Sequence, residues 1–298
     1  RPKSAILGGG GLPAGPVNQP YTFTLMRGQY AQITQLDPLS GSPVDADKPI
    51  GVFGGHQIMS IDRCCGDHGE QMLAPVRALG SEYVAAPHPD RKPGADPRIT
   101  RIYGAVDGTQ LIWDPPSTSA TTTVGLGEMV EVRTTGVYTV RSQDADHPFS
   151  MFTYMSGAGE AGEGGYGDPD FVRLVPPAQY LSHYVFFTDP SYPFTGLTIV
   201  RAKKDNAFAD VTLDCLGAPI GGWTPVGASG AYQITTVKLV DHWNSQGGCN
   251  NGVHTMDSQA PFGVWVWGWG SEDTTTGWVS YGYPAGENVR FINDIVVN

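Results

Sequence analysis

An internal repeat of about one hundred residues constrains the fold more than any other feature of this sequence. Residues 45–49 (DADKP) recur as residues 144–148 (DADHP), 99 positions later, and residues 258–265 form a degenerate third copy. The same shift, or one two residues longer, aligns further pairs: Phe53 with Phe152, Gly66 with Gly167, Asp67 with Asp168 and Tyr83 with Tyr184. A repeating unit of this size with several short strands is typical of a β-sandwich.

The local pattern predicts strands and turns along the whole chain. Apolar runs of about four to seven residues, rich in β-branched and aromatic residues, are bounded by Gly, Pro, Asn or Asp. Gly and Pro account for 40 and 24 of the 298 residues, and only 16% of residues are charged. Helical proteins are richer in Ala, Glu, Lys and Leu. We therefore expect an all-β fold built from tandem β-sandwich units.

The repeat divides the chain into three units, of which the first is incomplete. Unit 1 covers residues 1–75, unit 2 residues 76–172 and unit 3 residues 173–298. Unit 1 lacks its opening strands, which predicts an open sheet edge and an exposed apolar face. Residues 289–297 resemble a strand that could join the sheet of a neighbouring copy, or else close unit 3 of its own chain.

Composition and charge exclude some classes of function. Lys and Arg number 18 against 29 Asp and Glu, giving a net charge of −11, and no basic cluster is present. An acidic chain of this kind is a poor match for nucleic acid. No run approaches the roughly 18 apolar residues of a transmembrane helix. No charged-then-apolar leader follows Arg1, so we expect any signal peptide to have been removed.

Several segments, in order, resemble the N-terminal region of the IgGFc-binding protein family. They are residues 48–56 (KPIGVFGGH), 66–75 (GDHGEQMLAP), 261–268 (PFGVWVWG) and 280–286 (SYGYPAG). The resemblance implies a secreted or surface-displayed protein without catalytic residues. Ile58 stands where the animal pattern has a cysteine, and the sequence has no Asn-x-Ser/Thr sequon. Both departures favour a bacterial-type member and put IgG binding in doubt.

Four cysteines, in a chain predicted to be extracellular, suggest disulfides. Cys215 and Cys249 both fall in unit 3 and would close a loop of about 35 residues. Cys64 and Cys65 could then form a vicinal disulfide, which is strained because adjacent Cα atoms lie only about 3.8 Å apart.

Candidate binding residues are aromatic and lie near the end of unit 3. Trp265, Trp267 and Trp269 alternate along a predicted strand and therefore share one face, and Tyr281 and Tyr283 follow. These residues could form the core face of unit 3. They could instead form an exposed aromatic platform for a sugar ring or a protein partner.

The sequence predicts no cofactor, and each group of candidate metal ligands has another explanation or lacks a known ligand spacing. The pairs Asp45/Asp47 and Asp144/Asp146 could hold Ca²⁺, but their position before a proline in both copies favours a turn role. His, Cys, Asp and Glu residues between positions 56 and 70 match no known zinc spacing. No nucleophile elbow, nucleotide loop or metalloprotease signature occurs.

Together these observations predict a non-enzymatic extracellular binding or adhesion module that recognises a protein or a glycan. The alternative is a structural subunit of an extracellular fibre or surface coat. In that case the open edge of unit 1 would mediate self-association by accepting a strand from a neighbour.

Overall fold

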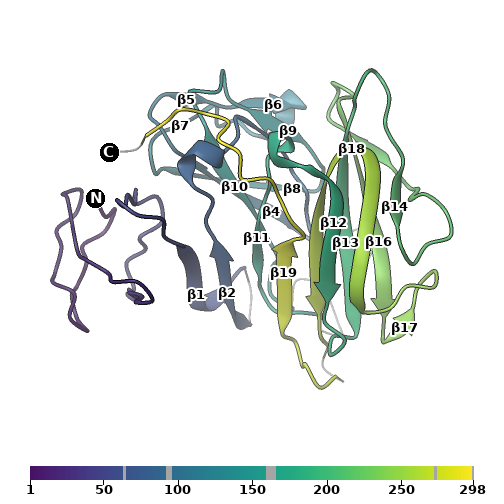
Figure 1. Cartoon of the computed structure of the whole chain (residues 1–298), viewed down its shortest axis with the longest axis horizontal. Helices are drawn as coiled ribbons and strands as arrows, with labels where there is room; N and C mark the ends of the chain where they lie inside the picture. The colour runs from purple at the N-terminus through teal and green to yellow at the C-terminus, as the bar shows by residue number, and fades with distance from the viewer. Residues whose placement is uncertain (63–64, 92–95, 159–165, 272–273, 297–298) are drawn as a thin grey trace.

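The computed structural model describes residues 1–62, 65–91, 96–158, 166–271 and 274–296, and it is built almost entirely of strands and loops (Figure 1). The strands are β1 (Phe53–Ser60), β2 (Gly66–Met72), β3 (Glu82–Val84), β4 (Arg98–Gly104), β5 (Thr109–Gln110), β6 (Ile112–Asp114), β7 (Thr123–Val124), β8 (Met129–Thr134), β9 (Thr139–Arg141), β10 (Phe149–Tyr154), β11 (Phe171–Arg173), β12 (Leu181–Thr188), β13 (Phe194–Ala202), β14 (Val211–Leu213), β15 (Thr224–Val226), β16 (Tyr232–Asp241), β17 (Asn244–Ser245), β18 (Gly252–Trp269) and β19 (Ser280–Pro284). Three short 3₁₀ helices are η1 (Val76–Ala78), η2 (Pro116–Thr118) and η4 (Pro177–Gln179). The all-β prediction is confirmed.

The strands form several antiparallel sheets. A four-stranded sheet has the order β11-β10-β4-β8, and a three-stranded sheet has the order β3-β9-β6. An eight-stranded sheet has the path β12-β18-β13-β16-β15, with β14 and β19 also paired to β18 and β17 paired to β16. Two-stranded sheets are β1-β2 and β5-β7.

One hairpin register occurs three times in these sheets. Phe53 pairs with Met72 in β1–β2, Phe152 with Arg173 in β10–β11, and Trp265 with Pro284 in β18–β19. The first two pairs are related by the sequence shifts of 99 and 101 residues that define the repeat. Trp265 corresponds to Phe152 because each stands three residues after the Phe of a Pro-Phe pair (residues 148–149 and 261–262), and on this basis the three pairs are taken as equivalent.

Three hydrophobic cores lie between the layers of strands. The largest contains side chains from β3, β4, β8, β9, β10 and β11 together with Trp265, Trp267 and Trp269 of β18. A second core lies on the opposite face of β18 and includes Val264 and Val266. A third joins Met59 and Ile61 of the β1 region to Phe152, Tyr154 and Phe171 of the four-stranded sheet, with Ile99 of β4. In Figure 1 these layers run from β1–β2 through β4, β8, β10 and β11 to the large sheet.

The boundaries of the three units stay a prediction. The largest core combines side chains of residues 76–172 with side chains of residues 173–298, so these two parts of the chain share buried surface.

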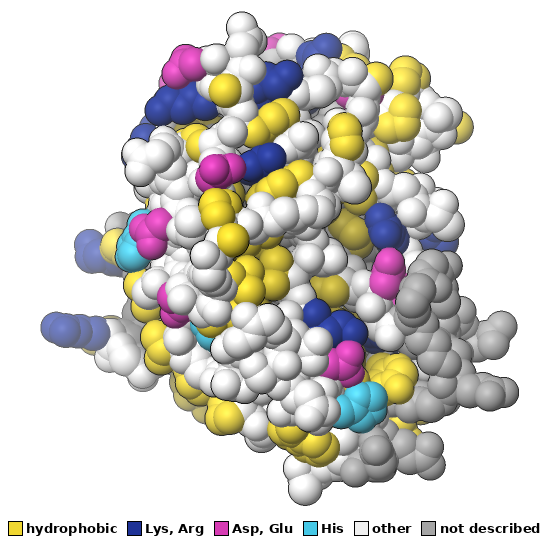
Figure 2. All heavy atoms as spheres, turned by 90° about the vertical axis from the view of Figure 1, so that its right-hand side faces the viewer, with side chains coloured by type: hydrophobic (Ala, Val, Ile, Leu, Met, Phe, Trp, Pro, Cys, Tyr) yellow, Lys and Arg dark blue, Asp and Glu magenta, His cyan; other side chains and the backbone are white. Residues whose placement is uncertain are grey.

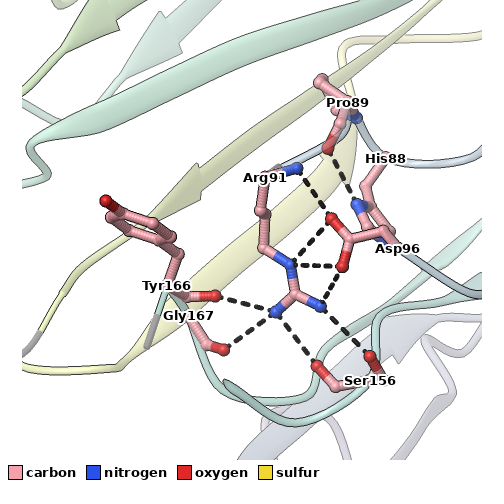
Figure 3. A network of polar contacts seen from close by, with 7 residues as sticks. All are labelled: His88, Pro89, Arg91, Asp96, Ser156, Tyr166 and Gly167. Carbon is pink, nitrogen blue, oxygen red and sulfur yellow. Dashed lines mark hydrogen bonds and ion pairs between the residues drawn. The ribbon is translucent and has the colours of Figure 1, made fainter. Parts of the chain in front are cut away.

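A buried polar network crosses this core region (Figure 3). The Arg91 and Asp96 side chains are 0% and 1% exposed, and Arg91 Nη2 lies 2.7 Å from Asp96 Oδ1. Arg91 Nη1 also donates to the carbonyl oxygens of Ser156, Tyr166 and Gly167, at 3.1, 2.8 and 3.0 Å. One guanidinium thus ties the segment before β4 to the segments on either side of residues 159–165.

The C-terminal segment does not form the predicted strand. Residues 289–296 are neither helix nor strand, and they lie against η1 of the same chain. Ile292 N donates to Arg77 O at 2.8 Å, and Asn293 Nδ2 donates to Val76 O and Leu79 O, both at 2.9 Å. The expectation that this segment closes unit 3 as a strand is therefore wrong for these residues, and its addition to the sheet of a neighbouring copy stays a prediction. Residues 297–298 lie outside the described residues.

Candidate functional site

The three equivalent hairpins differ in what covers the second edge of their first strand. Strand β4 pairs with β10 there, with Arg101 opposite Phe152, and β13 pairs with β18, with Thr198 opposite Trp265. In the described ranges, β1 pairs only with β2. The second edge of β1 is therefore the position at which the other two copies hold a further strand.

The hydrogen bonds between β1 and β2 show which backbone groups of β1 lie at this second edge. Val52 O accepts a hydrogen bond from Leu73 N at 2.9 Å, so Val52 faces the strand beside it. Successive residues of an antiparallel strand alternate in the direction of their N–H and C=O groups. Phe53 and Gly55 accordingly direct their backbone groups away from β2. Beyond them a bulge between His56 and Met59 interrupts the register.

Apolar side chains are exposed beside these backbone groups. Phe53 is 61% exposed, its cross-strand neighbour Met72 is 55% exposed, and Ile58 is 68% exposed. The residues equivalent to Phe53 are Phe152 and Trp265, which are only 7% and 0% exposed. We define the β1 edge as the backbone of Phe53 and Gly55 with the side chains of Phe53, Ile58 and Met72.

The three tryptophans of β18 are buried. Trp265, Trp267 and Trp269 are 0%, 0% and 5% exposed, and Trp265 Nε1 donates to Arg173 O at 3.1 Å. They share one face, as the alternation predicts, and that face packs into the largest core. An exposed aromatic platform at these residues is therefore ruled out in this structure, because the opposite sheet layer covers them.

Tyr281 and Tyr283 are half-buried and bind the neighbouring backbone. Tyr281 Oη accepts a hydrogen bond from Asp189 N at 3.1 Å, and Tyr283 Oη accepts one from Phe187 N at 3.2 Å. Their rings stack with centroids 6.3 Å apart. Ligand binding by these two tyrosines stays a prediction.

Cys215 and Cys249 form the predicted disulfide. Asp214 and His254 lie beside Cys215, with His254 Nδ1 2.9 Å from Asp214 Oδ1, but the sulfur atom is already bonded to Cys249. The predicted Cys64–Cys65 bridge involves Cys64, which lies outside the described residues.

The repeated aspartate pair has a turn role in its second copy. Asp144 Oδ1 accepts a hydrogen bond from Asp146 N at 3.0 Å and lies 2.6 Å from His147 Nδ1. The hydrogen bond from His147 is the largest cause that lowers the pKa of Asp144. In the first copy, Asp45 and Asp47 are exposed. Calcium binding at either pair stays a prediction.

The fold and the β1 edge together define a class: an all-β, disulfide-bonded protein in which β1, alone among the three equivalent first strands, is paired on a single edge within the described residues. No helix in the described part of the chain is long and apolar enough to cross a membrane. The family described as IgGFc binding protein matches residues 1–268, and the chain belongs to this family. Searches of curated proteins and of solved structures found no match.

Sequence reasoning predicted an open edge in unit 1 but did not find the residues that form it. The alignment of Phe53 with Phe152 was the available signal. This alignment shows that the strand containing Phe53 is repeated. The structure shows in addition that a further strand adjoins the two later copies (β4 and β13), and that the described part of the first copy has no such strand.

Proposed function

We propose that this chain is an extracellular, non-enzymatic binding module that recognises a protein partner by accepting a strand of that partner at the β1 edge. One observation carries the proposal. Two of three equivalent first strands are paired on both edges, and β1, within the described residues, is paired on one.

Strand addition suits the chemistry of this edge. Unpaired N–H and C=O groups of an edge strand are a template for another strand, and neighbouring side chains add specificity. Phe53 and Met72 would contact apolar side chains at alternate positions of the incoming strand. Strands β4 and β13 fill the equivalent edges within this chain, so they indicate the kind of sequence that fits.

Exposed apolar surface alone does not select this site. Hydrophobic side chains are also exposed at the opposite end of the molecule, where charges of both signs lie among them (Figure 2). A protein partner accounts for the β1 edge better than a glycan, because the tryptophans that favoured a sugar platform are buried. The disulfide supports an oxidising, extracellular location.

The test measures binding of labelled peptides by fluorescence polarisation. The peptides carry residues 98–104 (RITRIYG) and 194–202 (FTGLTIVRA), which are the β4 and β13 sequences. We expect saturable binding that Phe53→Pro weakens by about tenfold, equivalent to about 1.4 kcal/mol. Proline removes the N–H at the free edge and leaves the β1–β2 hydrogen bonds in place.

Matched controls separate backbone pairing from loss of the aromatic ring. Phe53→Ala keeps the edge N–H, and Phe187→Ala removes a ring that is similarly exposed, at 51%, on β12. Scrambled peptides control for general stickiness, and an IgG Fc fragment tests the ligand that the family description names. Equal binding to the native chain and to Phe53→Pro, or equal binding of scrambled peptides, would refute strand addition at β1.

The same edge favours a second candidate function, a fibre or coat subunit in which another copy of this chain supplies the strand. This function predicts a mass that rises with concentration in light scattering and a monomeric mass for Phe53→Pro. A native chain that stays monomeric across the concentration range would rule it out.

A further inference from the structure

The return strands of the three hairpins meet at one junction. Gln71 of β2 donates from Nε2 to Gly282 O of β19 at 3.1 Å, and Arg173 of β11 donates from Nε to Met72 O of β2 at 3.3 Å. Side chains therefore join strands that belong to three different sheets. In Figure 1, β2, β11 and β19 lie beside one another.

Three carboxylates lie where these strands begin. Asp67 is in β2, Asp170 directly precedes β11, and Asp168 lies three residues before the start of β11. Asp67 Oδ2 accepts a hydrogen bond from Ser280 N of β19 at 3.3 Å, and Asp170 Oδ1 accepts one from Phe171 N at 2.7 Å. Asp170 is only 5% exposed.

Two buried oxygen atoms at this junction lack hydrogen-bond partners within the described part of the chain. They are Asp168 Oδ1 and the hydroxyl Oγ of Ser280, whose residue is 8% exposed. The Ser280 hydroxyl points toward the Gly167 turn, since a Cβ built on Gly167 would lie 2.5 Å from it. Asp168 is the next residue of that turn, and Asp67 accepts a hydrogen bond from the Ser280 backbone, so Asp67, Asp168 and Ser280 are neighbours at this junction.

Burial is the main cause that raises the pKa of two of these carboxyl groups. Burial, and secondly the charge of Asp67, raises the pKa of Asp168 to about 6. Burial is also the largest cause that raises the pKa of Asp170 to about 8, and Asp67 raises it further. The charge of Arg91 lowers the pKa of Asp168, and the Arg91 guanidinium is itself paired with Asp96.

We propose that Asp67, Asp168 and Ser280 bind a calcium ion that joins the three hairpins. Carboxylate and hydroxyl oxygens are the hard ligands that Ca²⁺ prefers, and its flexible coordination admits backbone carbonyls and water as well. The ion would supply the partner that Asp168 Oδ1 and Ser280 Oγ lack. Because one ligand comes from each of the three hairpins, binding would hold β1–β2 against the rest of the molecule.

Isothermal titration of the chelator-treated chain with CaCl₂ tests the site, with MgCl₂ as a comparison. We expect a dissociation constant of about 10⁻⁴–10⁻³ M, as in other extracellular modules. Hydrogen exchange should slow in β2, β11 and β19 when Ca²⁺ is added. Asp168→Asn and Ser280→Ala should each weaken binding about tenfold or more, whereas Asp144→Asn, in the other candidate calcium pair, should leave it unchanged.

The variants also separate binding from folding. Asp168→Asn removes a repelled charge, so its unfolding temperature in chelator should not fall below that of the native chain. No heat of binding at about 10 mM Ca²⁺, well above the expected range, would overturn the proposal. Native affinity in both Asp168→Asn and Ser280→Ala would overturn it too, and a larger effect of Mg²⁺ would reassign the ion. None of these readouts depends on peptide binding at β1.

Discussion

Arg91→Ala gives the sharpest test of how the centre of the molecule is held together. The Arg91 side chain is fully buried, and it donates to Asp96, to Ser156 and to the carbonyls of Tyr166 and Gly167. Alanine leaves the Asp96 carboxylate buried without its cation and removes the donor from three carbonyl oxygens. Removing one partner of a buried ion pair costs about 3–5 kcal/mol.

The expected thermal shift follows from the size of the chain. Because the entropy of unfolding scales with length, 1 kcal/mol corresponds to roughly 2 °C for a domain of more than 200 residues. Arg91→Ala should therefore lower the unfolding temperature by about 6–10 °C, measured by differential scanning calorimetry at pH 7. Asp96→Asn should also destabilise. The double variant should cost less than the sum of the two, because neither charge is then left alone.

The control is Arg133→Ala, which removes an arginine that is paired at the surface. Its side chain is 48% exposed beside Glu131 and Asp62, so the expected cost is about 0–1 kcal/mol. If Arg91→Ala and Arg133→Ala shift the unfolding temperature equally, or if the two central substitutions are simply additive, the reasoning from burial fails.

Three further predictions test other parts of the structure. Cys215→Ser opens a disulfide with a sequence separation of 34 residues and should destabilise by roughly 3–4 kcal/mol, seen as a lower unfolding temperature that reductant no longer changes. Trp267→Ala should cost about 3–5 kcal/mol because the ring is fully buried, whereas a stable variant with lost binding would contradict a core role. Burial, and secondly Arg91, lowers the pKa of His88 to about 4. The unfolded chain therefore takes up this proton first, and about 3 kcal/mol of stability is lost as the pH falls from about 6.5 towards 4. A pH titration of the unfolding temperature should show this loss, and His88→Gln should reduce it.

The sequence predicted the fold class because local signals were consistent. Short β-branched and aromatic runs between turn residues specify strands without knowledge of their partners. The Cys215–Cys249 bridge followed from two cysteines that fall in the same unit. Neither inference needed the position of a distant segment.

The tryptophans of β18 show what the sequence pattern could not predict. Alternation establishes that Trp265, Trp267 and Trp269 share a face, but not what covers that face. The run 261–269 is apolar at nearly every position, which is typical of a strand buried on both sides. Both faces are in fact buried, because Val264 and Val266 pack in one core while the tryptophans pack in another.

The prediction of a strand in the C-terminal segment was wrong for a different reason. Residues 289–296 have the composition of a strand, yet their backbone and Asn293 side chain bond to residues 76–79. Irregular backbone that is anchored by side-chain hydrogen bonds has no periodic signature. Only the tertiary structure could identify it.

The repeated hairpin explains why the unfilled edge lies on β1. The return strands β2, β11 and β19 contact one another through side chains such as Gln71 and Arg173. Each first strand can therefore extend its sheet only on the edge away from its return strand. Strands β4 and β13 occupy that edge in two copies. Within the described residues the hairpin occurs three times and the adjoining strand twice, so the second edge of β1 is the one left without a strand among these three copies.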